Sequence, residues 1–128
     1  MKKLGEILIE RNILTKAELD QLLEKQKVTK EKLGDLVVKN GYLTEDRLLK
    51  IVAEQYGLQY VNIREVVIPV YLQKEFNYEI LKRYRIVPLK LEDKKLYVGI
   101  NNVDVLREID EISFNLGKNV TPVLLNAV

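Results

Sequence analysis

Two near-copies of one stretch decide the fold of this chain: KLGEILIERNILTKAELDQLLEKQ at residues 3–26 and KLGDLVVKNGYLTEDRLLKIVAEQ at residues 32–55. The second copy begins 29 positions after the first, so that Gly5, for example, recurs as Gly34. The apolar residues recur in the same phase as the identities. A fixed offset over two dozen residues is typical of a duplicated supersecondary unit. We therefore interpret residues 1–57 as a duplicated helical subdomain.

Each copy predicts a short helix, a tight turn and a longer helix. Asn12 and Gly41 stand where the apolar stripe breaks, and both residue types tolerate the left-handed conformation that ends helices. Thr15 and Thr44 follow as N-caps, and Thr15 with Glu18 has the spacing of a capping box. The buried face of the longer helices is expected to comprise Leu19, Leu22, Leu23, Leu48, Ile51 and Val52.

Gly5 and Gly34 lie one turn into a predicted helix, where glycine costs about 1 kcal/mol relative to alanine. Two interpretations explain their recurrence. The glycines allow a close approach between helices, or they leave bare backbone against which a ligand lies. The sequence does not decide between them.

Residues 58–128 predict a small α+β subdomain with the order β-α-α-β-β-α-β. An extended segment at 59–63 precedes helices at 70–76, with Pro69 in the first turn, and at 78–84. Alternating residues predict strands at 85–91 and 95–100, joined by a hairpin connection, and Pro88 places the first of them at a sheet edge or at a bulge. An amphipathic helix over 103–116, ended by Gly117, and a strand over 119–125 follow. The fold class is therefore α+β, with a four-helix subdomain first.

The bulk composition excludes several classes of function. The 21 Lys and Arg residues nearly balance 19 Asp and Glu residues, and the net charge of +2 disfavours electrostatic binding of nucleic acid. The chain has neither cysteine nor histidine, so disulfides and thiolate or imidazole metal sites are excluded. No apolar run reaches the roughly 18 residues of a membrane-spanning helix, and the charged N-terminus is not a signal peptide. We expect a cytoplasmic protein without direct membrane insertion.

No catalytic constellation is visible in the sequence. Phosphate-binding glycine loops, nucleophile elbows and metal-ligand spacings are absent. The carboxylate pairs at 92–93 and 110–111 are interpreted as solvated surface charges. The basic cluster of Lys82, Arg83 and Arg85 is interpreted as ordinary surface, with an acidic protein partner as the alternative. We expect that the chain is not an enzyme and requires no cofactor or metal.

The twin motif resembles the MshEN domain, the N-terminal domain of type II secretion and type IV pilus assembly ATPases. That family has two 24-residue motifs, approximately RLGxxLxxxGxIxxxxLxxxLxxQ, separated by five residues, and residues 27–31 provide the same spacing here. The second half is similar as well, through Ile86-Val-Pro-Leu89, Asp110-Glu-Ile-Ser-Phe114 and Val120-Thr-Pro-Val123. The resemblance implies a regulatory and docking domain of such an ATPase, peripheral at the inner membrane through a partner.

The resemblance also implies a cyclic di-GMP site shared by the two motifs. The residues carried over are Lys3, Leu4, Gly5, Ile7, Leu8, Ile13, Leu14, Leu19, Leu23 and Gln26 in the first motif. In the second they are Lys32, Leu33, Gly34, Leu36, Val37, Tyr42, Leu43, Leu48, Val52 and Gln55. Lysine replaces both motif arginines, which keeps the charge but loses the planar fork that bonds a base. The ligand hypothesis predicts that Leu4, Leu33 and the two lysines line one exposed groove.

A second hypothesis needs no ligand. In it the repeats form a four-helix scaffold that docks the cytoplasmic domain of an inner-membrane secretion or pilus platform protein, and the leucines and glycines serve core packing. Arginine in both motifs would have favoured the ligand hypothesis, but lysine stands at both positions.

Overall fold

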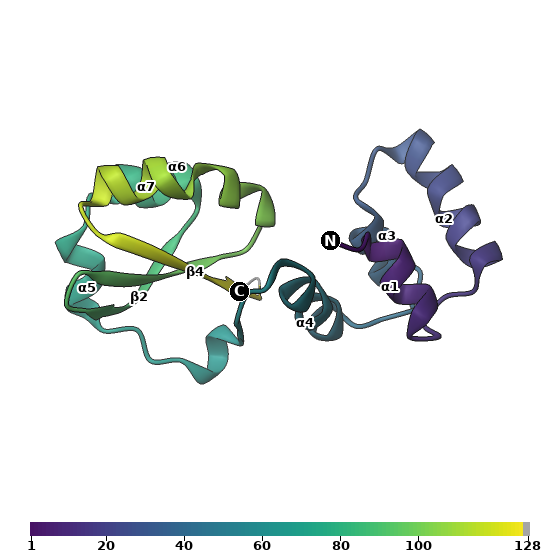
Figure 1. The fold of residues 1–128 in the computed structure, drawn as a ribbon, viewed down its shortest axis with the longest axis horizontal. Coiled ribbons are helices and arrows are strands. Elements are labelled where there is room, and N and C mark those ends of the chain that lie inside the picture. The colour runs from purple at the N-terminus through teal and green to yellow at the C-terminus, as the bar shows by residue number, and fades with distance from the viewer. Residues whose placement is uncertain (127–128) are drawn as a thin grey trace. The chain divides into compact units, whose positions relative to one another are not determined.

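The computed structural model describes residues 1–126 and divides into two compact units, one ending at Gly57 and the other beginning at Leu58 (Figure 1). The first unit contains α1 (Leu4–Glu10), α2 (Lys16–Thr29), α3 (Leu33–Lys39) and α4 (Glu45–Tyr56). Each repeat is thus a short helix followed by a longer one, as the sequence predicts. Asn12 and Gly41 have φ values of 58° and 80° in the intervening turns, which confirms their left-handed conformation.

Threonine side chains begin both longer helices. The Thr15 hydroxyl accepts a hydrogen bond from the Glu18 backbone N–H at 3.2 Å, and the Thr15 N–H donates to the Glu18 carboxylate at 2.9 Å, which completes the predicted capping box. Thr44 accepts from the Arg47 N–H at 3.3 Å, without a returning acidic side chain. The same cap therefore starts α2 and α4, but the first copy has one hydrogen bond more.

One apolar core holds the helical unit together, and both repeats contribute to it. The buried members are Leu8, Leu14, Leu22, Leu36, Val37, Leu43, Leu48 and Ile51. Leu23, predicted on the buried face of α2, is instead 37% exposed, because its Cβ points about 100° around the helix from that of the 2%-exposed Leu22. Because the core draws on all four helices, we expect the two repeats to unfold together.

The second unit is built on a sheet with the strand order β1-β4-β3-β2. Its strands are β1 (Tyr60–Val61), β2 (Val87–Glu92), β3 (Lys95–Ile100) and β4 (Asn119–Leu125). The pairs β1–β4 and β3–β4 are parallel, and β2–β3 is an antiparallel hairpin. Both expectations for Pro88 are met: β2 is an edge strand, and its register shifts between Pro88 and Lys90.

Helices α5 (Val70–Glu75) and α6 (Tyr78–Tyr84) precede the hairpin, and α7 (Ile109–Leu116) precedes β4. Pro69 is the N-cap of α5 rather than part of its first turn, and Arg85 ends α6 at φ 54°, so β2 begins at Val87, later than predicted. A 3₁₀ helix, η1 (Ile63–Glu65), follows β1. Figure 1 shows α6 and α7 together on one side of the sheet, where α7 packs against β4.

The single helix predicted over 103–116 is two elements in the structure, a 3₁₀ helix η2 (Val103–Glu108) and then α7. Apolar residues recur every three positions at Val103, Leu106, Ile109 and Ile112, which is the period of a 3₁₀ helix, and this spacing suits the change of helix type. Gly117 ends α7 at φ 68°, as predicted. Along residues 1–126, the helices and strands otherwise follow one another in the predicted order, with η1 as an addition.

A close approach explains one glycine of the sheet. A Cβ atom on Gly99 would lie 2.2 Å from Leu125 Cδ1, so only glycine leaves room for that leucine across the β3–β4 pair. Leu125 belongs to a small buried cluster with Leu89 and Val123. Among residues 1–126, no helix is long and apolar enough to cross a membrane.

Candidate functional site

The two motif glycines are packed against leucines of the following helix. A Cβ on Gly5 would lie 3.1 Å from Leu19 Cδ2, and one on Gly34 would lie 3.1 Å from Leu48 Cδ2. Leu19 and Leu48 are themselves equivalent in the 29-residue repeat. Of the two interpretations of these glycines, the structure therefore supports the close approach between helices.

The predicted ligand residues fall into three groups by burial. Gly5, Leu8, Leu14, Leu36, Val37, Leu43 and Leu48 are buried in the helical unit. Leu4, Ile7, Ile13, Leu19, Gln26, Leu33, Gly34, Tyr42, Val52 and Gln55 are half-buried, whereas Lys3, Leu23 and Lys32 are exposed. A surface ligand can touch only the second and third groups, because the core leucines are enclosed by other side chains.

The beginnings of the two motifs meet at the short helices. A Cβ on Gly34 would lie 3.7 Å from Leu4 Cδ2, so α1 and α3 approach each other at this point. Lys3 and Lys32 are the residues immediately before α1 and α3, and both have extended backbone conformations. Leu4 and Leu33 retain exposed surface and both lysines are exposed. That these four residues line a single groove stays a prediction.

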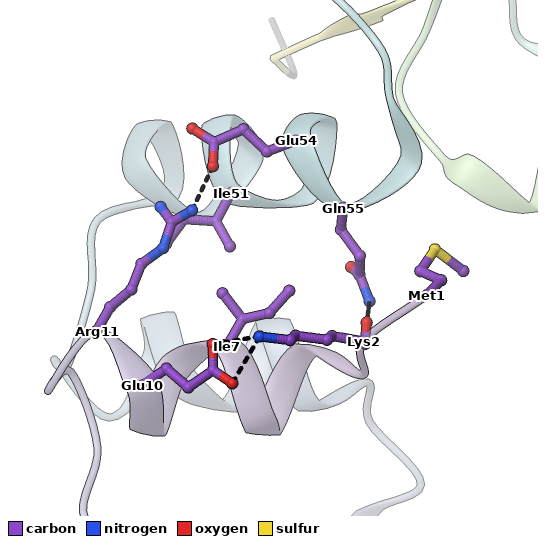
Figure 2. Close-up of a pocket in the computed structure, with 8 residues that line it drawn as sticks. All are labelled: Met1, Lys2, Ile7, Glu10, Arg11, Ile51, Glu54 and Gln55. Carbon is purple, nitrogen blue, oxygen red and sulfur yellow. Dashed lines mark hydrogen bonds and ion pairs between the residues drawn. The ribbon is translucent and has the colours of Figure 1, made fainter.

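The helical unit has a pocket of about 350 Å³ between α1 and α4, which we call the α1–α4 pocket (Figure 2). Ile7 and Ile51 form its apolar centre. On one side Arg11 forms an ion pair with Glu54, and both side chains are partly exposed. The pocket therefore combines an apolar surface with a cation and an anion held side by side.

The start of the chain lines the opposite side of the pocket. Lys2 pairs with Glu10 at 2.8 Å, and the Gln55 side-chain amide donates to the Lys2 carbonyl oxygen at 3.0 Å (Figure 2). Gln55 is the last residue of the second motif, so its hydrogen bond brings the end of that motif to the beginning of the first. Motif reasoning found only Ile7 and Gln55 of this pocket. Arg11 and Glu54 escaped it because they occupy variable positions of the motif.

The equivalent place in the other half of the unit carries different charges. The repeat offset relates Arg11 to Asn40 and Glu54 to Lys25, and Lys25 Nζ donates to Asn40 Oδ1 at 2.9 Å. The geometry of the contact is repeated, although arginine and glutamate are replaced by an amide and an ammonium group. Here the α2–α3 contact takes the place of the α1–α4 contact.

The Lys2–Glu10 ion pair also has a counterpart in the other half, in which the acidic and basic residues exchange places. Lys2 and Glu10 correspond to Glu31 and Lys39, and Lys39 Nζ lies 3.5 Å from the Glu31 carboxylate. The repeat thus keeps the location of each polar contact while changing the groups that make it. Because these pairs are exposed, they contribute little to stability, and their chemistry is free to serve recognition.

Glu18 links the two repeats electrostatically. Hydrogen bonds from the Thr15 backbone and hydroxyl, together with one from Tyr42, lower the pKa of the Glu18 carboxyl. Partial burial and the Glu18 charge raise the pKa of the Tyr42 phenol. Tyr42 lies in the turn of the second repeat, whereas Glu18 caps α2 of the first. This contact has no counterpart by offset, because Glu18 corresponds to Arg47 and Tyr42 to Ile13.

Comparison with known proteins identifies relatives of the whole chain. The MshEN domain family matches residues 56–127. The type IV pilus assembly ATPase PilB of Myxococcus xanthus is 24% identical over 126 residues, which are 98% of this chain and 22% of PilB. Bacteriophage adsorption protein B of Escherichia coli is 31% identical over 99 residues, which are 77% of this chain and 13% of that protein.

The fold itself is shared with a solved structure of MshE with cyclic di-GMP (cdg). The two superpose with a TM-score of 0.86 at 24% identity, over 98% of this chain and 91% of the other. The chain spans about a fifth of the length of its PilB relative. The matched family segment covers the α+β unit, and the likeness to MshE extends the shared fold over the repeats.

Proposed function

The chain belongs to the MshEN domain family, and from this premise we propose that it regulates a type IV pilus or type II secretion ATPase by binding cyclic di-GMP on its helical unit. As an MshEN domain it is a regulatory domain without catalytic function. Regulation then depends on ligand binding and on a partner, in the cytoplasm at the inner membrane.

The observation that carries the proposal is the twofold recurrence of an exposed lysine beside a half-buried leucine. Lys3 with Leu4 and Lys32 with Leu33 begin the two short helices, and Leu4 reaches Gly34 of the other repeat. Cyclic di-GMP has two guanines and two phosphates. Two copies of one motif therefore suit the two halves of this ligand, with a cation for each phosphate and apolar surface for the bases.

The shared fold supports the same assignment. MshE, whose structure contains cyclic di-GMP, has the same fold over almost the whole of this chain. Regulation of a pilus ATPase is inferred from PilB, of which this chain matches only a fifth. We propose that the half-buried and exposed motif residues contact the ligand. The buried motif leucines form the core that holds these residues in position.

The test is isothermal titration of cyclic di-GMP into the purified chain, with GTP and cyclic di-AMP as comparison ligands. We expect saturable binding that weakens in Leu4→Ala and Leu33→Ala. Each variant removes a half-buried side chain, so circular dichroism must first show that it is folded. Lack of any heat from cyclic di-GMP at high concentration, with a folded wild-type chain, would sink the proposal.

One observation favours the second candidate, a ligand-free docking module. Leucine packing explains Gly5 and Gly34, so these positions need no ligand to account for them. In this case the helical unit binds the cytoplasmic domain of a platform protein whether or not the nucleotide is present. Co-purification of that domain with the chain in nucleotide-free buffer, together with a negative titration, is the result expected for the docking module.

A further inference from the structure

Arg11 and Glu54 form an ion pair that the proposed function does not use, because both residues occupy variable positions of the motifs. Arg11 follows the last residue of α1 and Glu54 lies in the last turn of α4, so the pair joins the two helices along one side of the α1–α4 pocket. The side chains are 46% and 61% exposed, and a ligand can therefore reach both. Half-buried Ile7 provides the accessible apolar surface beside them, and buried Ile51 lies behind it.

The pair presents an ordered set of hydrogen-bonding groups. A guanidinium has only donors and a carboxylate only acceptors, and the ion pair fixes them side by side. The Watson–Crick edge of guanine carries the O6 acceptor followed by the N1–H and N2–H donors. An arginine beside a glutamate complements this order. Adenine carries the N6 donor followed by the N1 acceptor, and would set donor against donor and acceptor against acceptor.

The motif lysines cannot supply this recognition. Lys3 and Lys32 are point charges that suit phosphate but do not distinguish one base from another. The equivalent place in the other half offers Lys25 and Asn40, of which the ammonium group has no acceptor. Leu36, the counterpart of half-buried Ile7, is only 2% exposed, whereas Leu22 and its counterpart Ile51 are both buried, so a base has less apolar surface in the other half through the loss of this one position. The two halves of the helical unit therefore differ in their capacity to recognise a guanine base.

We propose that the α1–α4 pocket binds a guanine base, with Arg11 donating to O6, Glu54 accepting from N1–H and N2–H, and half-buried Ile7 against the base. The inference rests on the proposed function, which it deepens: it assigns the preference for guanine to one half of the helical unit. The other half then contributes charge rather than base specificity. Arg11 and Glu54 are binding residues that no motif position predicts.

The repeat itself provides the decisive variant. Arg11→Asn combined with Glu54→Lys copies the pair found at residues 40 and 25, whose contact the same backbone geometry already accommodates. Isothermal titration of the full chain would compare this double variant and Glu54→Gln with wild type, using cyclic di-GMP, cyclic di-AMP and GTP. Lys25→Gln and Asn40→Ala are the matched controls.

We expect the double variant and Glu54→Gln to bind cyclic di-GMP about ten- to a hundredfold more weakly, because hydrogen bonds to a charged group are lost. Their preference for cyclic di-GMP over cyclic di-AMP should fall, while the two controls keep it. Unchanged affinity and preference in the double variant would overturn the inference and leave the proposed function standing. Binding of GTP alone, lost in the double variant, would support the pocket as a guanine site and overturn the cyclic di-GMP proposal. A wild type that binds none of the three overturns both.

Discussion

The two repeats of the helical unit differ in their surface far more than in their backbone. Both keep the threonine cap, the left-handed turn residue and the glycine packed on a leucine. The polar contact between a short helix and the long helix of the other repeat differs, however. Arg11 pairs with Glu54 between α1 and α4, whereas the equivalent residues, Asn40 and Lys25, form the contact between α3 and α2. The comparison teaches that the capping and core positions specify the fold, whereas the polar contacts around them are free to diverge.

The strongest test of this comparison concerns one equivalent core position. Leu36 is 2% exposed, whereas its counterpart Ile7 is half-buried at the α1–α4 pocket. Leu36→Ala is expected to lower the free energy of unfolding by about 2–5 kcal/mol, and Ile7→Ala by about half as much or less, because less apolar surface is lost. Urea denaturation measures both. Equal losses would show that the two halves are packed alike.

The glycine positions test whether the repeats share one packing rule. Gly5→Val and Gly34→Val should each destabilise the unit by about 1–3 kcal/mol, because Leu19 and Leu48 already lie 3.1 Å from the first added carbon. The alanine variants serve as controls, since the gain in helix propensity of about 1 kcal/mol offsets the tighter contact. Thermal and urea unfolding report the result. Wild-type stability in either valine variant contradicts the close approach at that repeat.

The helix caps should separate the repeats by a smaller amount. Thr15→Ala removes one half of a capping box and is expected to cost about 1–2 kcal/mol, whereas Thr44→Ala removes a single hydrogen bond and should cost about 0.5–1 kcal/mol. The midpoint of urea unfolding gives both values under one set of conditions. The reverse order of the two losses is incompatible with the capping box as the source of the difference.

The smallest expected effect is a dependence on pH that only the first repeat provides. The pKa of Glu18 is lowered in the folded chain, first by the Thr15 backbone N–H, so its carboxylate stabilises the fold fully only above the ordinary pKa that the group has when unfolded. That stabilisation is lost as the pH falls through the lower, folded pKa. Between pH 5 and pH 3, wild type should therefore lose more stability than Glu18→Gln. Arg47→Gln, at the equivalent position, should leave the acid dependence as in wild type.

The contrast between the two units explains how far sequence reasoning reached. In the helical unit, caps and turn residues act within a few positions, and Thr15, Thr44, Asn12 and Gly41 all behave as their local signals predict. In the α+β unit the strands at 95–100 and 119–125 match the prediction, but the strand order and the parallel pairing of β3 with β4 depend on contacts far apart in the chain. The sequence likewise predicted one α-helix over 103–116, because the apolar pattern was compared with the α-helical period alone. The structure instead has η2 followed by α7.

The sequence by itself determined the duplication, the α+β class and the resemblance to the MshEN family, because these follow from a fixed offset and from local patterns of polarity. Only the tertiary structure decided which motif leucines are buried in the core and which retain exposed surface. On a short helix, one apolar stripe contains both kinds of residue, and the sequence does not distinguish them. It alone brought Arg11 to Glu54 across 43 positions of sequence. Both residues occupy variable positions of the motifs, and the packing of α1 beside α4 is what makes them one candidate site.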